Sequence, residues 1–266
     1  MPWLQRNGYR LYHTQDGDPA APALVLSHSL GANLSMWDPQ VEALKDRFRL
    51  IRYDHPGHGK SDTIGHTPTI GELGMDAAAL LDELGLKSTF FCGLSLGGMV
   101  GLWIGANLGG RLRKLVVSST TARIENTDLL RGRIRTIRTA GLAAISESVI
   151  QNWFSPGFTT EHPLAKQNAL EMLARVHSEA YSALAETVCE MDLRDQLARI
   201  RIPTLILYGT EDKATPPAWN LALHEQIGGS RVAALSAAHM ANIEAAESFT
   251  SLLGSFLKGR ERQGLR

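Results

Sequence analysis

The sequence of 266 residues contains little cysteine, no long apolar run and no recognisable secretory signal. Its two cysteines, Cys92 and Cys189, are too few for a disulfide framework, which favours a reducing cytoplasm as the location. Because nowhere do about eighteen apolar residues follow one another, the sequence predicts no membrane span. The N-terminus lacks the basic start and apolar core of a signal peptide. These absences together predict a soluble, cytoplasmic protein.

An excess of charge of either sign is also missing, since 27 basic side chains balance 27 acidic ones. No block rich in lysine or arginine stands out, which argues against nucleic acid or an anionic membrane as a partner. A neutral balance fits an enzyme that acts on small molecules, and it fits many binding proteins as well. The expected partner is a small molecule, with no nucleic acid, no membrane and no particular oligomeric state predicted.

What the chain does contain is a regular alternation of strand-like and helix-like runs. Some of the strand-like runs, such as residues 23–27, are continuously apolar, which is typical of strands buried on both faces of a parallel sheet. An Asn7-Gly8 pair marks a hairpin at the start. The predicted strands number eight: residues 3–6, 9–14, 23–27, 48–53, 88–91, 115–117, 202–208 and 231–235. Their alternation with helices predicts an α/β fold with a mostly parallel, doubly wound, eight-stranded sheet.

The strand–helix rhythm stops between the sixth and seventh predicted strands. This segment reads as several short helices, predicted over residues 129–139, 142–154, 162–175 and 179–189. The sequence therefore predicts a helical cap over residues 121–200, inserted after the sixth strand. Residues 1–120 and 201–266 are expected to form the core domain. The charged end, residues 258–266, is expected to fray.

One motif organises the chain, a Gly-x-Ser-x-Gly pattern over residues 93–97 between a strand-like and a helix-like run. Ser95 on such a turn must adopt a strained backbone to raise its hydroxyl above the sheet edge. Side chains in place of Gly93 or Gly97 would collide with neighbouring backbone. A Gly/Ser loop that matches the pattern by chance is the alternative, and the flanking strand and helix argue against it. The motif predicts Ser95 as a nucleophile.

A serine nucleophile needs a base, and the base needs an acid that orients it. In folds with this turn the acid follows a later strand and the histidine comes last. His239 lies in a loop directly after the last predicted strand, whereas His224 lies within a helix, so we predict His239 as the base. The loop after the strand at residues 202–208 offers Glu211 and Asp212. Asp212 stands at the turning point of that loop and is the predicted acid.

An oxyanion hole needs two main-chain N–H groups near the nucleophile. One is expected from Leu96, which follows Ser95, and the other from the loop after the strand at residues 23–27. Leu30 is the preferred donor in that loop, and Ser29 is the alternative. His28 of the same loop is expected to support it by hydrogen bonding rather than to act in catalysis.

Two further patterns have competing interpretations. The His55-x-x-His58 pair suggests a metal, but it lies in a Pro/Gly turn without a Cys or Glu to complete a ligand shell. We expect neither a metal nor a cofactor.

A predicted cap helix carries a row of arginines: Arg131, Arg133, Arg135 and Arg138. A solvated face is the simpler interpretation, and a contact with a substrate carboxylate is the alternative. Trp153 could line an apolar pocket or simply hold the cap together.

These motifs resemble those of the α/β-hydrolase superfamily along the whole chain. Within it, the sequence is similar to the 3-oxoadipate enol-lactonases of aromatic catabolism, in the β-ketoadipate pathway. The matching segments are residues 29–38, 121–124, 153–154, 191–194 and 239–244. The resemblance implies a catalytic triad of Ser95, Asp212 and His239, and it places the family's lid arginine on Arg133. The chain departs from the family pattern at His28, Leu130 and Ala180.

The expected function is therefore that of a serine hydrolase that opens a lactone or ester through an acyl-enzyme. The resemblance implies 3-oxoadipate enol-lactone as the substrate, with Arg133, Trp153 and Ser29 as substrate contacts. A broad carboxylesterase that acts on small neutral esters is one alternative. A hydrolase-fold receptor that binds a small molecule is another. The departures from the family pattern concern the pocket rather than the catalytic chemistry.

Overall fold

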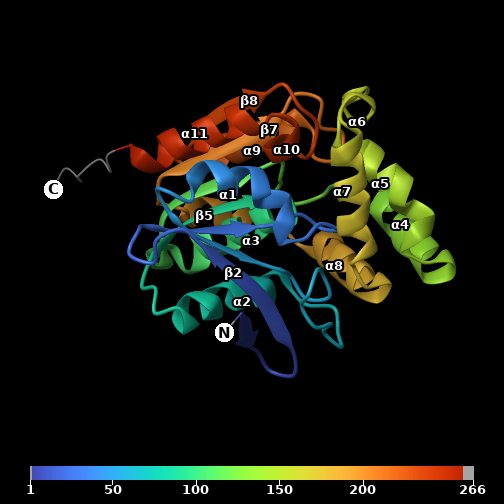
Figure 1. The fold of residues 1–266 in the computed structure, drawn as a ribbon, viewed down its shortest axis with the longest axis horizontal. Helices are drawn as coiled ribbons and strands as arrows, with labels where there is room; N and C mark the ends of the chain where they lie inside the picture. The colour runs from blue at the N-terminus through green and yellow to red at the C-terminus, as the bar shows by residue number, and fades with distance from the viewer. Residues whose placement is uncertain (1, 260–266) are drawn as a thin grey trace.

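An eight-stranded sheet runs through the computed structural model, which describes residues 2–259 (Figure 1). The strands are β1 (Trp3–Gln5), β2 (Arg10–Asp16), β3 (Ala23–Ser27), β4 (Arg49–Tyr53), β5 (Thr89–Leu94), β6 (Leu112–Ser118), β7 (Thr204–Gly209) and β8 (Arg231–Leu235). Their order in the sheet is β1-β2-β4-β3-β5-β6-β7-β8. β2 pairs antiparallel with β1 and β4, and the other pairs are parallel. The predicted mostly parallel, eight-stranded sheet is confirmed.

Helices cover both faces of the sheet and bury its apolar side chains. The helices α1 (Asp38–Leu44) and α11 (Ala246–Lys258) pack on one face, and α2 (Ile70–Glu83), α3 (Leu96–Asn107) and α9 (Pro217–Gln226) pack on the other. Strand β3 contributes to both apolar clusters in alternation, Leu24 and Leu26 to one and Ala23 and Val25 to the other. The doubly wound arrangement follows from this burial on both sides.

A group of helices occupies the chain between β6 and β7, as predicted. These insertion helices are α4 (Asp128–Ala140), α5 (Ser146–Trp153), α6 (Phe158–Glu161), α7 (Pro163–Ala174) and α8 (Ser178–Glu190). They gather at one end of the sheet, on the right of Figure 1. Buried side chains of the insertion, Trp153 and Leu173 among them, belong to the same apolar cluster as Leu24 and Trp37 of the sheet layer. The insertion is thus packed onto the sheet layer by a continuous apolar contact.

Shorter elements complete the chain: the four-residue helix α10 (Ala241–Glu244) and the 3-10 turns η1 (Leu34–Trp37), η2 (Gly109–Arg111), η3 (Leu142–Ile145) and η4 (Arg194–Arg199). The sequence does not predict α6 or α10, because four residues are too few to display a helical period. Within residues 2–259, no helix is both long enough and apolar enough to cross a membrane. The end of the charged tail, residues 260–266, lies outside the described residues.

Candidate active site

Ser95 lies on the sharp turn between β5 and α3, with φ 55° and ψ −115°. This is the strained backbone that the motif predicts, and it is unusual for a residue with a side chain. The two glycines that flank Ser95 in the motif lie close to neighbouring backbone. A Cβ on Gly93 would lie 2.1 Å from the Gly97 carbonyl oxygen, and one on Gly97 would lie 2.1 Å from the Ser27 carbonyl oxygen. The turn therefore exists only because both positions lack a side chain.

His239 and Asp212 meet in a buried hydrogen bond of 2.9 Å between Nδ1 and Oδ2. The two residues follow β8 and β7, which are parallel neighbours at the same edge of the sheet as the Ser95 turn. Asp212 also accepts from the N–H groups of Ala214 and Thr215, at 2.8 and 3.0 Å, and from the Thr215 hydroxyl at 2.7 Å. The carboxylate is thus fully supplied with donors despite its burial.

The Asp212 carboxyl remains an anion in this setting. Burial alone raises its pKa, but the attraction of His239 and the hydrogen bonds from His239 and Thr215 outweigh burial, so the pKa lies below its usual range. An ionised, well-anchored carboxylate fixes the proton of His239 on Nδ1 and turns Nε2 into an acceptor. The pair is therefore arranged to take a proton from a neighbouring group.

Buried polar groups connect the Ser95 turn to the Asp212 loop. The Thr120 hydroxyl donates to the Ser95 carbonyl at 2.8 Å, and the Thr120 N–H donates to Asn220 Oδ1 at 3.2 Å. Asn220 Nδ2 in turn donates to the Thr215 carbonyl at 3.2 Å. Within residues 2–259, the Ser95 hydroxyl itself makes no hydrogen bond, to a histidine or to any other group. The structure thus ties the two loops together through Thr120 and Asn220.

Sequence motifs do not identify these connecting residues. Thr215 has a local signal, because an Asp whose side chain accepts from the N–H groups two and three residues later is typical of an Asx-turn. Thr120 and Asn220 have none, since each contacts residues that are remote along the chain. Their identification requires the folded structure.

Among residues 29–32 of the loop after β3, one N–H group has no hydrogen-bond partner. Ser29 N–H donates to Met36 Sδ at 3.4 Å, Gly31 N–H to His58 Nε2 at 3.1 Å, and Ala32 N–H to the Ser29 carbonyl at 3.1 Å. Among the described residues, the Leu30 N–H has no hydrogen-bond partner. Leu96 is the first residue of α3, so its N–H has no partner within the helix. Leu30 and Leu96 thus each carry an N–H group without such a partner, in two segments that are joined where the Gly97 N–H donates to the His28 carbonyl at 3.1 Å.

Two buried histidines, His28 and His55, brace this loop. His28 Nε2 accepts from the His55 N–H at 2.9 Å, so the proton lies on Nδ1, which donates to the Ser29 carbonyl at 2.7 Å. His55 Nε2 lies 3.2 Å from the Ser27 hydroxyl. Burial lowers the pKa of His28 well below its usual value and that of His55 to about 3, so both rings are neutral. The expectation that His28 supports the loop by hydrogen bonding is confirmed.

His58 completes the brace from the second loop. Its Nε2 accepts from the Gly31 N–H, and its Nδ1 donates to the Pro56 carbonyl at 3.0 Å. Burial lowers the pKa of His58 to about 4, which keeps the ring neutral and Nε2 free to accept. Both nitrogens of this ring are therefore engaged by the protein's own main chain.

Side chains of the insertion form the other wall of the site. A Cβ on Gly31 would lie 3.0 Å from Leu173 Cδ1 and from Tyr181 Cε2, and 3.4 Å from Trp153 Cζ2. Arg133 is half-buried on α4, whereas its neighbours on the same helix are exposed: Arg131, Arg135 and Arg138. Burial raises the pKa of the Tyr181 phenol, and the adjacent Arg133 guanidinium opposes that rise. Arg133 therefore reaches towards the site, next to a ring that touches the Gly31 loop.

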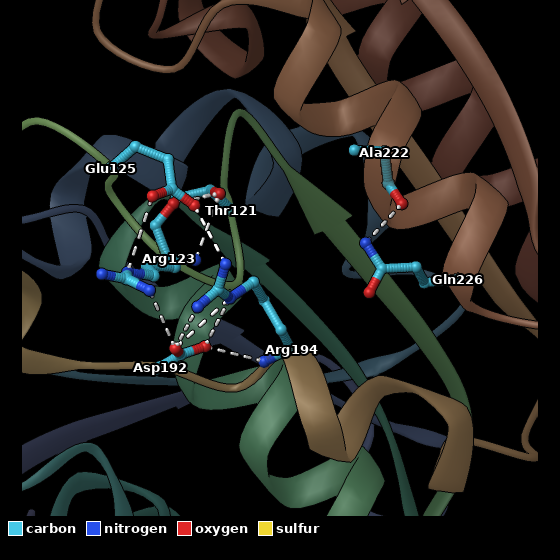
Figure 2. Close-up of polar contacts among 7 residues, drawn as sticks. All are labelled: Thr121, Arg123, Glu125, Asp192, Arg194, Ala222 and Gln226. Carbon is cyan, nitrogen blue, oxygen red and sulfur yellow. Dashed lines mark hydrogen bonds and ion pairs between the residues drawn. The ribbon is translucent and has the colours of Figure 1, made fainter.

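The two chain segments that connect the insertion to the sheet are joined at the surface by charged side chains (Figure 2). Arg194 bonds to Asp192 at 2.7 Å and to Glu125 at 3.2 Å, and Arg123 lies 3.4 Å from Asp192. Arg194 lowers the pKa of Asp192 to about 2. Asp192 thus belongs to this exposed ion-pair cluster and not to the group around His239.

Comparisons with known proteins agree with this geometry. Residues 24–251 match the Alpha/beta hydrolase family. A curated relative, 3-oxoadipate enol-lactonase 2 of Acinetobacter baylyi, is 36% identical over 91% of each chain. The crystal structure of the enol-lactonase from Burkholderia xenovorans LB400 is 35% identical, with a TM-score of 0.95 over 97% of this chain and 100% of that one. A thermophilic esterase from Thermogutta terrifontis is 27% identical, with a TM-score of 0.88 over 94% of this chain and 93% of that one.

The chain belongs to the alpha/beta hydrolase family, and within it the chain is similar to the 3-oxoadipate enol-lactonases. It is an enzyme, a hydrolase of the ester and lactone class.

Proposed function

We propose that the chain opens the ring of a carboxylate-bearing enol-lactone, 3-oxoadipate enol-lactone in the first place, through an acyl-enzyme on Ser95. The observation that carries this proposal is the buried 2.9 Å contact between His239 and Asp212, at the sheet edge that also holds the strained Ser95 turn. The enol-lactonase relatives support the substrate, and with it a role in aromatic catabolism. We further propose that residues 1–120 and 201–266 form the core and that residues 121–200 form a cap.

In this mechanism Asp212 holds the Nδ1 proton of His239, and Nε2 takes the proton of Ser95. The Ser95 oxygen then bonds to the lactone carbonyl carbon. The ring C–O bond breaks, and the leaving enol oxygen takes the proton from His239 and tautomerises to a ketone while it remains part of the acyl group. His239 next removes a proton from water, and the water oxygen bonds to the acyl carbon. The bond between that carbon and the Ser95 oxygen breaks, and the serine takes the proton back from His239. In this scheme the hydrogen bond between the Ser95 hydroxyl and His239 Nε2 forms only once the substrate is bound.

We assign the oxyanion hole to the N–H groups of Leu30 and Leu96. Within residues 2–259 neither of these N–H groups has a hydrogen-bond partner, whereas the Ser29 N–H donates to Met36. Each donor of this kind contributes about 3–4 kcal/mol to transition-state stabilisation. The neutral His28 supports the assignment, because its Nδ1 donates to the Ser29 carbonyl, which belongs to the same planar peptide unit as the Leu30 N–H. His58 fixes the next peptide unit through the Gly31 N–H.

We assign the substrate carboxylate to Arg133. A half-buried guanidinium is a stronger partner for an anion than the exposed arginines on the same helix. Trp153, whose ring touches the Gly31 loop, and Ser29 within that loop complete the proposed substrate contacts. Cys92 and Cys189 are both unpaired, which supports the proposed cytoplasmic location.

Ser95→Ala tests the chemistry. We expect the variant to fold normally and to lose at least about three orders of magnitude in kcat towards an enol-lactone and an aryl acetate. The matched control is Ser35→Ala, a serine outside the proposed machinery, which should keep its activity. A hydrolase-fold receptor would give at most one stoichiometric burst of product, so multiple turnovers by the wild-type enzyme exclude that reading. Near-normal kcat in Ser95→Ala would refute the nucleophile.

Arg133→Ala tests the substrate. We expect KM for the anionic enol-lactone to rise by about tenfold, with little change for a neutral aryl acetate. Arg135→Ala, an exposed arginine on the same helix, is the matched control and should change neither value. Equal effects of Arg133→Ala on both substrates would remove the argument for an anionic substrate.

A carboxylesterase that acts on small neutral esters is the second candidate. The apolar wall formed by Trp153 and Leu173 and the likeness to the Thermogutta terrifontis esterase favour it. The same panel separates the two, because a neutral-ester enzyme should show a higher kcat/KM for the aryl acetate than for the enol-lactone, with no dependence on Arg133.

A further inference from the structure

The short loop that carries His239 is held on both sides by hydrogen bonds. On one side the Ala238 N–H donates to Glu244 Oε2 at 2.9 Å. On the other side the Met240 N–H donates to the main-chain carbonyl of Trp153, at 2.8 Å. Trp153 ends α5, so the residue after the histidine is bonded directly to the insertion.

Glu244 extends this contact to the insertion a second time. Its carboxylate also accepts from the Ser155 N–H, at 3.2 and 3.3 Å, and from the Ser155 hydroxyl. Among the described residues no basic side chain pairs with Glu244. One carboxylate therefore joins the loop before His239 to the chain segment after α5 by accepting N–H and O–H donors only.

Glu244 is itself anchored in the sheet layer. It lies at the end of α10, and the Asn242 side chain of that helix donates to the Met36 carbonyl at 2.8 Å. Gln40 Nε2 donates to the Asn242 carbonyl, also at 2.8 Å. Both of these amide side chains are fully buried. The short helix is thus a fixed platform, from which Glu244 reaches the loop and the insertion at once.

From this arrangement we propose that Glu244 is a positioning residue for His239 that couples the catalytic base to the insertion helices. It fixes the Ala238 peptide and ties that peptide to Ser155, while the Met240–Trp153 bond does the same beyond the histidine. The placement of the imidazole therefore depends on the docking of residues 153–155. This inference rests on the proposed function, because it takes His239 as the base.

The consequence concerns kcat more than KM. The hydrogen-bond partners of Glu244 among the described residues are Ala238 and Ser155, not Ser95 or a proposed substrate contact. The separate Met240–Trp153 bond still holds Trp153, so the loss of Glu244 leaves binding largely intact. It does change the distance and direction over which His239 takes a proton. Misplacement of a catalytic group by about 1 Å can cost about a hundredfold in rate. A side chain that only stabilised the fold would lower the melting temperature without this kinetic signature.

The test compares steady-state kinetics on p-nitrophenyl acetate, a neutral ester that does not depend on Arg133. We expect Glu244→Ala to lower kcat by about tenfold or more with KM within about twofold, and to shift the acid limb of the pH profile of kcat/KM. Glu244→Gln should recover part of the loss, because its amide oxygen still accepts from the Ala238 N–H. Ser155→Ala should cost about twofold to threefold, since the Ser155 N–H remains.

Thr69→Ala is the matched control, because it removes the capping hydroxyl of α2, which bonds to Glu72 of the same helix, and destabilises the fold by about 1 kcal/mol. It should lower the melting temperature and leave kcat and the pH profile unchanged. Wild-type kcat in Glu244→Ala, with Ser95→Ala inactive, overturns the proposal. Activity in Ser95→Ala refutes the proposed function instead. If Glu244→Ala does not fold, wild-type kcat in both Glu244→Gln and Ser155→Ala overturns the proposal.

Discussion

The carboxyl edge of the sheet and the insertion helices differ in how their polar groups are held. At the edge, buried groups are bonded to nearby main chain, as Asp212 is to the Thr215 N–H and His58 is to the Gly31 N–H. In the insertion, the wall towards the site consists of the Trp153, Leu173 and Tyr181 side chains, with Arg133 beside Tyr181. Ion pairs such as that between Arg138 and Glu186 lie on the outside. Buried hydrogen bonds therefore fix the geometry of the edge, whereas the side chains of the insertion set the shape of the wall.

This difference separates reaction from selectivity. Buried hydrogen bonds to main chain leave a side chain one position, which is what proton transfer requires. Apolar contacts tolerate changes of side chain as long as volume is kept. Substitutions at the edge should therefore damage the chemistry, and substitutions in the insertion should change which compounds are accepted. Glu244 joins the two regions, because its carboxylate accepts from Ala238 at the edge and from Ser155 of the insertion.

Asp212→Asn would sharpen the comparison most. An amide cannot accept from every donor that now surrounds this carboxylate, and it does not stabilise the imidazolium. We expect kcat to fall by about four orders of magnitude, as in other serine hydrolases that lose this acid. Glu186→Gln in α8 loses the charge pair with the exposed Arg138 but keeps an oxygen that can accept from the Thr67 hydroxyl, so it should keep kcat within about twofold. Steady-state kinetics on one ester measure kcat for both variants. Equal losses of kcat would contradict the difference between the edge and the insertion.

Gly97→Ala tests the same contrast in stability. The added Cβ would lie 2.1 Å from the Ser27 carbonyl oxygen, so the backbone must shift, and we expect a loss of about 3 kcal/mol or more. Gly132→Ala in α4 meets only the flexible end of Arg135, at 3.7 Å. That change should stabilise the chain by up to about 1 kcal/mol. Urea unfolding of both variants measures the change in the free energy of unfolding. An unchanged stability in Gly97→Ala would contradict the close packing of the turn.

The pH dependence of stability should also arise at the edge. The pKa of His58 is about 4 in the folded chain and about 6.5 when unfolded, so between these values the unfolded chain binds a proton that the folded ring does not. Stability is therefore greatest above about pH 6.5 and declines as the pH falls towards about 4. His58→Gln should flatten this decline by up to about 1.4 kcal/mol per pH unit.

Urea unfolding at about pH 7 and about pH 5 measures the slope. His162→Gln, at an exposed position before α7, is the control in the insertion and should leave the slope unchanged. An unchanged slope in His58→Gln would show that this ring does not supply the pH dependence.

The smallest effect is expected at the exposed ion-pair cluster of Figure 2. Asp192→Asn removes the shared partner of Arg123 and Arg194, but water and salt screen such pairs, so we expect a loss below about 1 kcal/mol. Melting temperatures of the variant and the wild type at low and high salt should converge as salt rises. A loss well above this value, insensitive to salt, would mean that the connecting segments contribute as much as the edge does.

Much of the fold follows from local sequence. The bounds of β3 agree with the predicted 23–27, because a short unbroken apolar run is typical of a strand buried on both faces. The sequence predicts a strand over 88–91, but β5 continues to Leu94. Gly93 reads as part of a turn, yet it pairs with Val117 of β6. The end of β5 is set by its pairing with β6, which is remote along the chain, and no local sequence pattern predicts that pairing.

The candidate site divides in the same way. Ser95, Asp212 and His239 can be chosen from the motif and from the order of elements along the chain. The availability of the Leu30 N–H cannot, because it depends on Met36 and His58 engaging its neighbours. Contacts between segments far apart in sequence carry no local signature, and so the role of the insertion in the site also has to come from the structure.

The turn at Ser95 has a practical consequence. Its backbone conformation is imposed by the approach of Gly97 to the Ser27 carbonyl, a contact between two separate parts of the polypeptide. A molecule in which β3 has come away from its neighbours no longer has that contact, and we expect Ser95 to relax to an ordinary backbone geometry and ester turnover to be lost with it. Turnover of a chromogenic ester is therefore a sensitive gauge of the correctly folded fraction in any preparation, from refolding trials to libraries of variants.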